Sequence, residues 1–287
     1  MIDTTGTVVE NIETASGYRL LTLESRAIED IQPKAGQFAM VKAHDSFEPL
    51  LRRALAIYKV YSQGRVSFLY QVLGRGTQSL ASLQPGSKVD ALLPLGNVFP
   101  SETSTDPNSK APNRAIIVSG GIGSASLLML AREYGQRRDI SGGGIDARVF
   151  FGAANKDAAI GCGLRDFQSC GLPIVVTTDD GGLGEKGFVT SPLERELQKT
   201  GGVATTIYAC GPWAMMARTA EIAAKYGAYC LVSLEAPMGC GFGICVGCVF
   251  AVKSDGPPGY HSYKRVCIDG SIVDASTVGW DVTAMSH

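Results

Sequence analysis

Four of the eight cysteines in this 287-residue chain are gathered near its C-terminal end. Four residues separate Cys240 from Cys245, two separate Cys245 from Cys248, and eighteen separate Cys248 from Cys267. Three thiolates on one loop with a distant fourth form the spacing of plant-type [2Fe-2S] ligands. The spacing therefore predicts that these four cysteines hold a [2Fe-2S] cluster.

Glycines alternate with the cysteines of this loop. They let the backbone wrap closely around a cluster and direct N–H groups at its sulfurs. A structural zinc ion is the alternative, since four thiolates also suit tetrahedral zinc, but zinc sites favour two separated cysteine pairs. Cys162, Cys170 and Cys230 lie outside the pattern, and we expect them to be buried, unreactive thiols.

A glycine turn marks a second candidate site. Gly120, Gly121 and Gly123 follow the apolar run RAIIVSG and precede the amphipathic segment SASLLMLAREYGQR. A turn of this kind between a strand and a helix lets a pyrophosphate approach a helix N-terminus. Such turns are also common without any ligand, so this motif is weak by itself.

The tripeptide Cys210, Gly211 and Pro212 stands between the apolar run TTIYA and the helical pattern WAMMARTAEIAAKYG. Proline suits the first helical turn, and open α/β sheets bind ligands at the carboxyl ends of their strands. If Gly120 and Cys210 end neighbouring strands, a nicotinamide fits between them. We expect Cys210 to lie beside the nicotinamide without acting as a nucleophile.

Two acids, Asp179 and Asp180, end another expected strand. They are either solvated turn residues or ligands of an adenosine ribose. Acids there, without an adjacent pair of arginines, disfavour the extra phosphate of NADP and favour NAD.

A third candidate site lies in the N-terminal region. Arg53, in LLRRALAIY, and the turn GRGT at residues 74–77 are suited to a flavin pyrophosphate, with Gly76 and Thr77 at the start of a short helix. An arginine on a strand and a glycine-rich turn are more often structural, so these residues alone are poor evidence for a flavin.

The elements that must position these residues fall into three regions. Short alternating or β-branched runs over residues 1–100 predict an antiparallel β-barrel. Residues 101–113 are polar and are expected to be a linker. Strands alternate with helices over residues 114–232, which predicts a doubly wound parallel sheet. Residues 233–287, rich in Gly and Cys, are expected to form a small module around the cluster.

Composition excludes some classes of function. The formal net charge is −1 with no long run of Lys or Arg, so neither nucleic acid nor an anionic membrane is an expected partner. No apolar run approaches the ~20 residues that cross a bilayer, and the N-terminal residues lack a signal-peptide pattern. We therefore expect a cytoplasmic protein.

Together these features resemble the ferredoxin reductase superfamily over nearly the whole chain. Within it, the chain is most similar to the electron-transfer subunits of dihydroorotate dehydrogenase B. The most specific segments are SLEAPMGCGFGICVGC and YKRVCIDG, supported by DDGGLGEKGFVT and ACGPWAMM.

The resemblance implies that the barrel binds FAD. The residues that it assigns to FAD are Arg53, Ala54, Leu55, Ala56, Tyr70, Gln71, Val72, Gly76 and Thr77. The family's strand reads Arg-Pro-x-Ser, so Ala54 and Ala56 are departures, and the hydrogen bond of a serine at residue 56 is absent. Ser126 also stands where relatives have proline.

The resemblance further implies a route for electrons in pyrimidine biosynthesis. Dihydroorotate is oxidised at the FMN of a separate catalytic subunit, and electrons pass through the [2Fe-2S] cluster and FAD of this chain to NAD. A flavin is needed because NAD exchanges two electrons as hydride, whereas the cluster exchanges one at a time. No side-chain acid or base is required for the hydride step. Two such subunits with two catalytic subunits are the expected assembly.

Two alternatives remain open from the sequence. The same cofactors could serve another partner, in a hydrogenase, glutamate-synthase-like or transhydrogenase complex. A redox sensor or scaffold that binds cluster or zinc but no flavin is the alternative from a different class.

Overall fold

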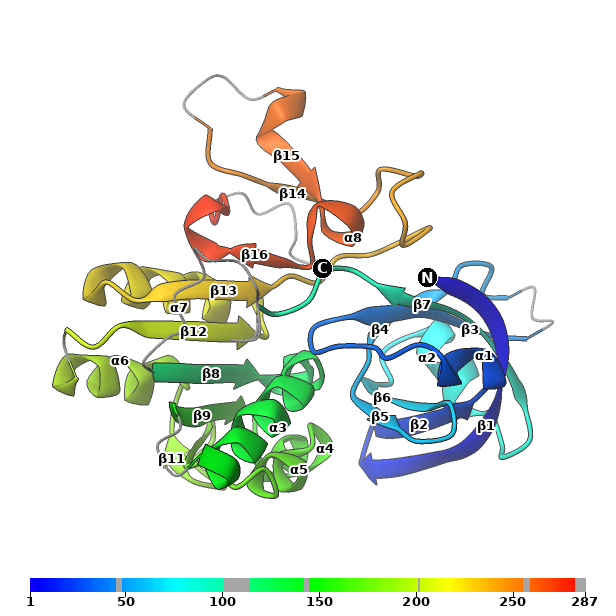
Figure 1. Cartoon of the computed structure of the whole chain (residues 1–287), viewed down its shortest axis with the longest axis horizontal. Helices are drawn as coiled ribbons and strands as arrows, with labels where there is room; N and C mark the ends of the chain where they lie inside the picture. Colours follow the sequence, from blue (N-terminus) through cyan, green and yellow to red (C-terminus); the bar gives the residue numbers. More distant parts are fainter. Residues whose placement is uncertain (45–47, 101–113, 142–144, 201, 255–258, 282–287) are drawn as a thin grey trace.

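The structure of this chain is a computed structural model, and it describes residues 1–44, 48–100, 114–141, 145–200, 202–254 and 259–281. The linker expected at residues 101–113 therefore lies outside the described residues. Three bodies are visible in Figure 1: a curled antiparallel sheet, a layered α/β domain beside it, and a small module above both. Among the helices of the described ranges, none is both long and apolar enough to cross a membrane.

The N-terminal body is a seven-stranded antiparallel sheet in the order β4-β3-β7-β1-β2-β6-β5, curled so that β4 contacts β6. Its core includes fully buried Leu21, Leu23 and Phe68. Leu20 and Leu69, one position away on β2 and β6, point to the opposite face and join the core of the α/β domain, as the period of two along a strand requires. The predicted antiparallel barrel is confirmed in this half-open form. Its strands and helices are β1 (Ile2–Ala15), β2 (Tyr18–Glu24), α1 (Arg26–Glu29), β3 (Phe38–Ala43), β4 (Arg53–Ala56), β5 (Lys59–Tyr61), β6 (Arg65–Gln71), α2 (Arg75–Ala81) and β7 (Lys88–Leu95).

The second body is a seven-stranded sheet in the order β11-β10-β9-β8-β12-β13-β16, parallel except for the last strand. Its central strand β8 is buried along its whole length, as expected for a parallel strand covered on both faces. The predicted doubly wound sheet is confirmed. Its elements are β8 (Arg114–Gly120), α3 (Ser124–Ser141), β9 (Asp146–Ala153), α4 (Lys156–Gly161), α5 (Leu164–Gln168), β10 (Ile174–Thr178), β11 (Glu185–Lys186), α6 (Thr190–Lys199), β12 (Thr205–Cys210), α7 (Trp213–Tyr226), β13 (Tyr229–Ser233) and β16 (Ile272–Asp274).

Helices cover both faces of this sheet. Helices α3, α4 and α5 pack on one face, and α6 and α7 pack on the other. The α7 helix starts after Pro212 and ends at Gly227, whose φ of +69° suits a residue without a side chain.

The third body carries the cysteine loop. It contains the hairpin of β14 (Val249–Ala251) with β15 (Tyr263–Arg265), followed by α8 (Val266–Asp269). Strand β16 then returns to the α/β sheet, although it lies beyond residue 232, where we expect that domain to end. The module and the α/β domain are thus joined through one sheet.

The apolar cores run across the boundaries between the bodies. Met40 and Leu95 of the barrel share a core with Cys248 and Cys267 of the module and with one face of the α/β sheet. A continuous core of this kind fixes how the three bodies face each other.

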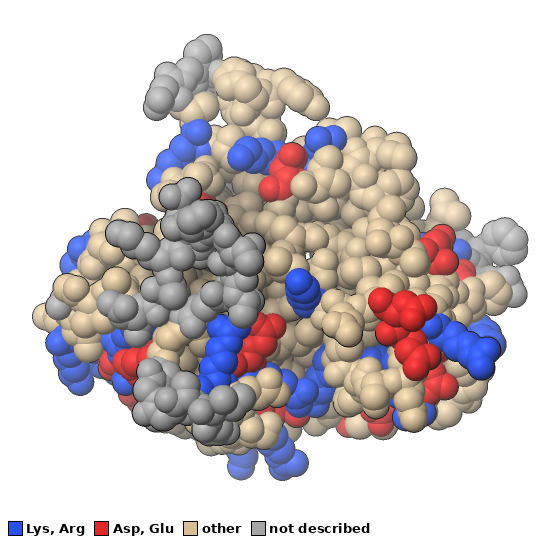
Figure 2. Space-filling view, in the orientation of Figure 1, with Lys and Arg blue, Asp and Glu red and all other residues tan. Residues whose placement is uncertain are grey.

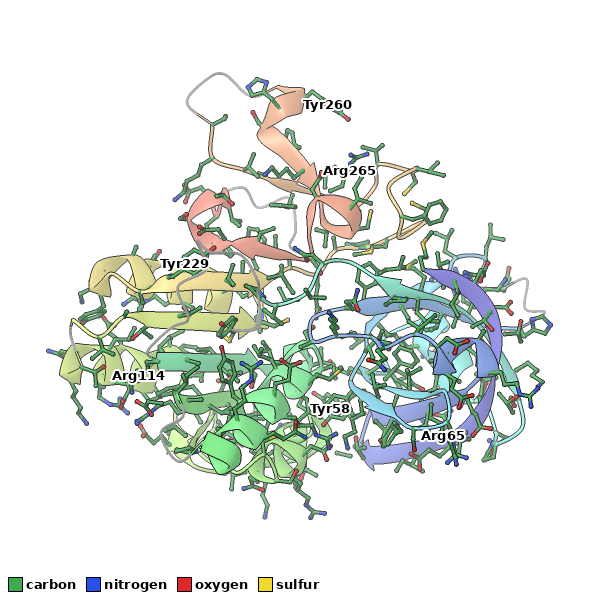
Figure 3. The ribbon with its side chains drawn as sticks, viewed as in Figure 1. Tyr58, Arg65, Arg114, Tyr229, Tyr260 and Arg265 are labelled. Atoms are coloured by element: carbon green, nitrogen blue, oxygen red, sulfur yellow. The ribbon has the colours of Figure 1, made fainter. Side chains whose placement is uncertain are left out.

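Polar contacts also join the barrel to the α/β domain. The Tyr58 hydroxyl donates to Oδ2 of Asp166 over 2.6 Å, and Lys59 Nζ lies 2.8 Å from Oδ1 of the same carboxylate. Figure 3 shows Tyr58 where the barrel faces α4 and α5. These contacts hold the two bodies together at one end of their interface.

Candidate functional site

The ends of three parallel strands meet at one edge of the α/β sheet. Ser119 of β8 pairs with Cys210 of β12, and Ala209 of β12 pairs with Val232 of β13. Gly120 and Cys210 therefore end neighbouring strands, which is the condition that the sequence set for a nicotinamide site.

A cleft of about 590 Å³ lies between this edge and the barrel. Residues of all three bodies line it, so none of the bodies could form it alone. From the barrel come Ala54, Leu55, Ala56, Tyr70, Gln71 and Thr77; from the α/β domain Gly120, Gly121, Gly123, Ser126, Gly211, Pro212 and Trp213; and from the entry to the module Glu235, Ala236, Pro237 and Met238.

The glycine turn and the Cys-Gly-Pro turn touch each other at the floor of this cleft. A Cβ on Gly123 would lie 2.6 Å from the carbonyl carbon of Cys210 and from the nitrogen of Gly211. Gly211, with a φ of +157°, would bring its own Cβ within 2.9 Å of Gly120. The glycines are thus required for close packing of the two turns.

Four of the residues expected at cofactors do not line the cleft. Arg53 borders a second hollow of about 510 Å³, and its guanidinium packs over Gly76, where any Cβ would collide with it. The side chain of Val72 packs into the barrel core instead. Cys210 is fully buried behind the cleft wall.

The turn before α2 is held by Thr77. Its Oγ1 accepts hydrogen bonds from the N–H of Leu73 over 2.9 Å and of Gly74 over 3.2 Å. The helix begins at Arg75, so Gly76 and Thr77 lie in its first turn. This fixes the turn beside Arg53.

Glu235 also lines the cleft, although the sequence motif that contains it predicts no role for this residue. Its side chain is exposed toward the cleft, and desolvation by the protein groups around it raises the pKa of its carboxyl group. The Cys210 thiol donates to Oε1 of Glu235 over 3.8 Å, and burial followed by the charge of Glu235 raises the pKa of Cys210. The available signal was an acid two residues after the end of a buried strand.

The four clustered cysteines lie on the side of the module above the barrel. Cys248 and Cys267 are buried, Cys240 is half-buried and Cys245 is exposed. Burial acts to raise the pKa of Cys240, but hydrogen bonds from the N–H groups of Cys245 and Phe242 outweigh it and lower the pKa to about 6. Backbone donors therefore already favour a thiolate there.

Contacts link the four cysteines to one another. The N–H of Cys245 lies 3.5 Å from Sγ of Cys240, and the two side chains interact. Burial, then the adjacent thiols of Cys248 and Cys240, raise the pKa of Cys267 to about 12. Over the described ranges, no three His, Cys, Asp or Glu side chains converge on one metal position.

Neighbouring elements shape the cysteine loop. Gly241, with a φ of +83°, lies directly against the Met40 side chain of the barrel. The Arg265 guanidinium donates to the carbonyl of Gly243 over 3.3 Å and pairs with Asp269 (Figure 3). Barrel and hairpin thus both hold the loop that carries three of the cysteines.

Comparisons with known proteins identify the family. Residues 235–279 match the model of the iron-sulfur cluster binding domain of dihydroorotate dehydrogenase B. A relative described as "Dihydroorotate dehydrogenase B (NAD(+)), electron transfer subunit" from Geobacillus kaustophilus is 37% identical over 260 residues, covering 90% of this chain and 91% of the relative. The chain belongs to the electron transfer subunits of dihydroorotate dehydrogenase B.

Other matches agree with this membership. The electron transfer subunit from Caldanaerobacter subterraneus is 32% identical over 271 residues, covering 94% of this chain and 96% of that relative. The family is an oxidoreductase family of pyrimidine biosynthesis. The predicted function, an electron-transfer subunit of this dehydrogenase, is confirmed.

Solved structures show the ferredoxin reductase fold. A chain of the NADH-dependent reduced ferredoxin-NADP oxidoreductase has a TM-score of 0.75 at 24% identity and covers 96% of this chain and 90% of its own length. A ferredoxin NADP+ reductase from Neisseria gonorrhoeae with bound FAD and NADP has a TM-score of 0.62 at 16% identity, covering 79% of this chain and 92% of that one. This chain therefore combines an iron-sulfur cluster binding domain with the fold of FAD-binding reductases.

Proposed function

We propose that this chain carries electrons from the FMN of a dihydroorotate-oxidising catalytic subunit, through its own [2Fe-2S] cluster and FAD, to NAD+ in pyrimidine biosynthesis. One observation carries the proposal. A single cleft is lined by the barrel and by the ends of β8 and β12, and the cysteine loop packs on the same barrel through Gly241 and Met40. The proposed sites for the cluster, the flavin and the nicotinamide are thus joined through shared apolar packing.

The barrel side of the cleft suits FAD. Strand β4 offers backbone groups at Ala54 to Ala56, and small side chains leave room for a planar ring. Arg53 and the turn held by Thr77 stand at the adjoining hollow, where a guanidinium is suited to a pyrophosphate. We assign FAD to these residues, together with Tyr70, Gln71, Val72 and Gly76.

The opposite side of the cleft suits a nicotinamide. The turns at Gly120 and Gly211 are in van der Waals contact and carry no side chains that would fill the space in front of them. We assign NAD to Gly120, Gly121, Gly123, Cys210, Gly211 and Pro212.

A bound flavin would supply the conversion between a two-electron hydride and single electrons. The chain's own residues would hold the two rings facing each other. Cys210 is fully buried behind the cleft wall, and burial raises the pKa of its thiol and so favours the neutral form.

The pairing of the cysteine sulfurs favours [2Fe-2S] over zinc. Cys240 interacts most with Cys245, and Cys267 interacts more strongly with Cys248 than with Cys240. A binuclear cluster takes two protein ligands on each iron, whereas a structural zinc ion draws four ligands to one point. Two pairs of thiols therefore suit two irons.

NAD rather than NADP is the expected nucleotide. The carboxylate of Asp180 accepts a hydrogen bond from the N–H of Gly182 over 2.8 Å, which keeps an acid at the end of β10. An acid at this position disfavours a 2′-phosphate. The relatives' name, with NAD(+), supports the same choice.

The catalytic subunit is expected to dock on the module. Phe242, Ile244 and Val246 stand between the cysteines, and their side chains are exposed by 41%, 76% and 42%. Figure 2 shows few charged side chains over the part of the surface above the barrel. An apolar patch around a cluster is suited to a protein partner, and two copies of each subunit are the expected assembly.

An anaerobic titration with NADH tests the proposal, followed by visible and electron paramagnetic resonance spectra with iron, zinc and flavin analysis. Bleaching of a flavin band together with a [2Fe-2S] signal is the expected result. Dihydroorotate should reduce the protein only when the catalytic subunit is added. Zinc without flavin would refute the electron route, and reduction by a different donor would refute the partner.

A further inference from the structure

Asn97 stands at the junction of the barrel, the module and the α/β sheet, just after β7. Its side-chain amide donates from Nδ2 to the carbonyl oxygen of Ile272 over 2.7 Å and accepts at Oδ1 from the N–H of Ile272 over 2.8 Å. The Ser271 hydroxyl donates to the same Oδ1 over 3.2 Å. The Asn97 side chain thus makes the two backbone hydrogen bonds to Ile272 that a neighbouring strand would otherwise make.

The other edge of β16 is already paired. Ser233 of β13 is the strand partner of Ile272, so Asn97 occupies the edge that faces the barrel. Ile272 is only 5% exposed and shares a core with Phe99. The amide of Asn97 borders solvent, but the backbone that it binds is buried.

Glycines allow the two segments to approach this closely. A Cβ on Gly96, whose φ is +76°, would lie 2.8 Å from the Ser271 hydroxyl. A Cβ on Gly270, whose φ is +128°, would lie 2.7 Å from Nδ2 of Asn97. A glycine on each of the two segments is therefore needed for this close contact between the end of β7 and the residues before β16.

Both redox sites depend on this segment. Cys267 is in α8, which ends one residue before Gly270, and Ser271 lines the cleft. In Figure 1, α8 and β16 lie next to each other where the module meets the sheet. The contact between Tyr58 and Asp166, by comparison, joins the barrel to α5 and does not reach the module.

We propose that Asn97 is a positioning residue that fixes the separation between the cluster at Cys267 and the flavin in the cleft. This inference rests on the proposed function. Asn97 touches neither group, and it acts by holding residues 271 and 272 against the end of β7. Electron transfer between the two sites depends on that distance, whereas hydride transfer from NADH to the flavin does not.

The test compares Asn97→Asp and Asn97→Ala with a matched control, Asn155→Asp. At residue 97 an aspartate keeps the acceptor but directs a carboxylate oxygen at the Ile272 carbonyl. At residue 155 the side chain caps α4 by accepting from the N–H of Ala158, which an aspartate does equally well. The same change is thus disruptive at one site and neutral at the other.

Two measurements are made on the purified, cofactor-loaded protein. Hydrogen exchange at the Ile272 amide should accelerate about tenfold or more in both Asn97 variants, because that N–H loses its acceptor or its closed geometry. After rapid mixing with NADH, flavin bleaching should keep its wild-type rate, while reduction of the cluster slows about tenfold or more. The control should match the wild type in both.

The outcomes separate this inference from the proposed function. If NADH fails to bleach a flavin in the wild-type protein, the proposed function is wrong. If it does, wild-type cluster reduction in both Asn97 variants would overturn the positioning role. Equal slowing of flavin bleaching and cluster reduction would also overturn it, because that result makes Asn97 a general structural residue.

Discussion

Replacing Gly123 by alanine tests whether contact between the two glycine-containing turns is needed for nucleotide binding. The added Cβ would lie 2.6 Å from the carbonyl carbon of Cys210 and from the nitrogen of Gly211, and 2.7 Å from the Cys210 oxygen. All three are backbone atoms, so no side chain can rotate away. Since carbon contacts need about 3.5 Å, the turns must separate by roughly 1 Å.

The size of the effect follows from this overlap. Overpacking in a close-packed region costs about 1–3 kcal/mol. In the free protein the strain is relieved when the turns move apart, and the nucleotide must bring them together again. At about 1.4 kcal/mol per tenfold change, the dissociation constant for NAD+ should rise roughly 5- to 100-fold.

Titration calorimetry with NAD+ measures this change, alongside urea unfolding. Gly227→Ala is the control, since Gly227, unlike Gly123, lies outside the cleft, with a φ of +69° and open space where its Cβ would be. It should lose about 1 kcal/mol of stability without weakening nucleotide binding. Wild-type affinity in Gly123→Ala would refute the idea that these turns must touch to bind the nucleotide.

Three further changes test individual contacts. Desolvation raises the pKa of Glu235 above its ordinary value of 4.5, so the stability that this group contributes is present at low pH and is lost as the pH rises through the folded-state pKa. Glu235→Gln should therefore gain stability relative to wild type as the pH is raised above 4.5, which urea unfolding at several pH values measures. Asp166→Ala leaves Lys59, whose side chain is 11% exposed, without its carboxylate, and should lower the free energy of unfolding by about 1–3 kcal/mol, which a wild-type urea midpoint would contradict. Arg114→Met removes a buried guanidinium from Glu196 and should cost about 3 kcal/mol in thermal unfolding, whereas the double variant with Glu196→Leu should recover part of the loss.

The sequence was sufficient for local features whose signal lies within a few residues. The spacing from Cys240 to Cys267, the alternation of apolar residues in the barrel and the glycine turn after RAIIVSG each predict a structure from local chemistry. The short helix after Gly74 and the end of α7 at Gly227 follow from the same kind of reasoning. The nucleotide and flavin assignments carried over from the family stay predictions, although most of those residues line one cleft.

Contacts between distant segments could not be predicted in this way. The Cys210 thiol reaches Glu235, Gly241 reaches Met40, and Asn97 reaches Ile272, which lies 175 positions further along the chain. Propensity and periodicity describe neighbours along the chain, whereas these contacts depend on how the three bodies share their cores. The sequence by itself determined which chemistry the chain is equipped for. Only the tertiary structure decided how the cleft, the cysteine loop and the end of β7 are held together, because close packing between distant backbones has no local signal.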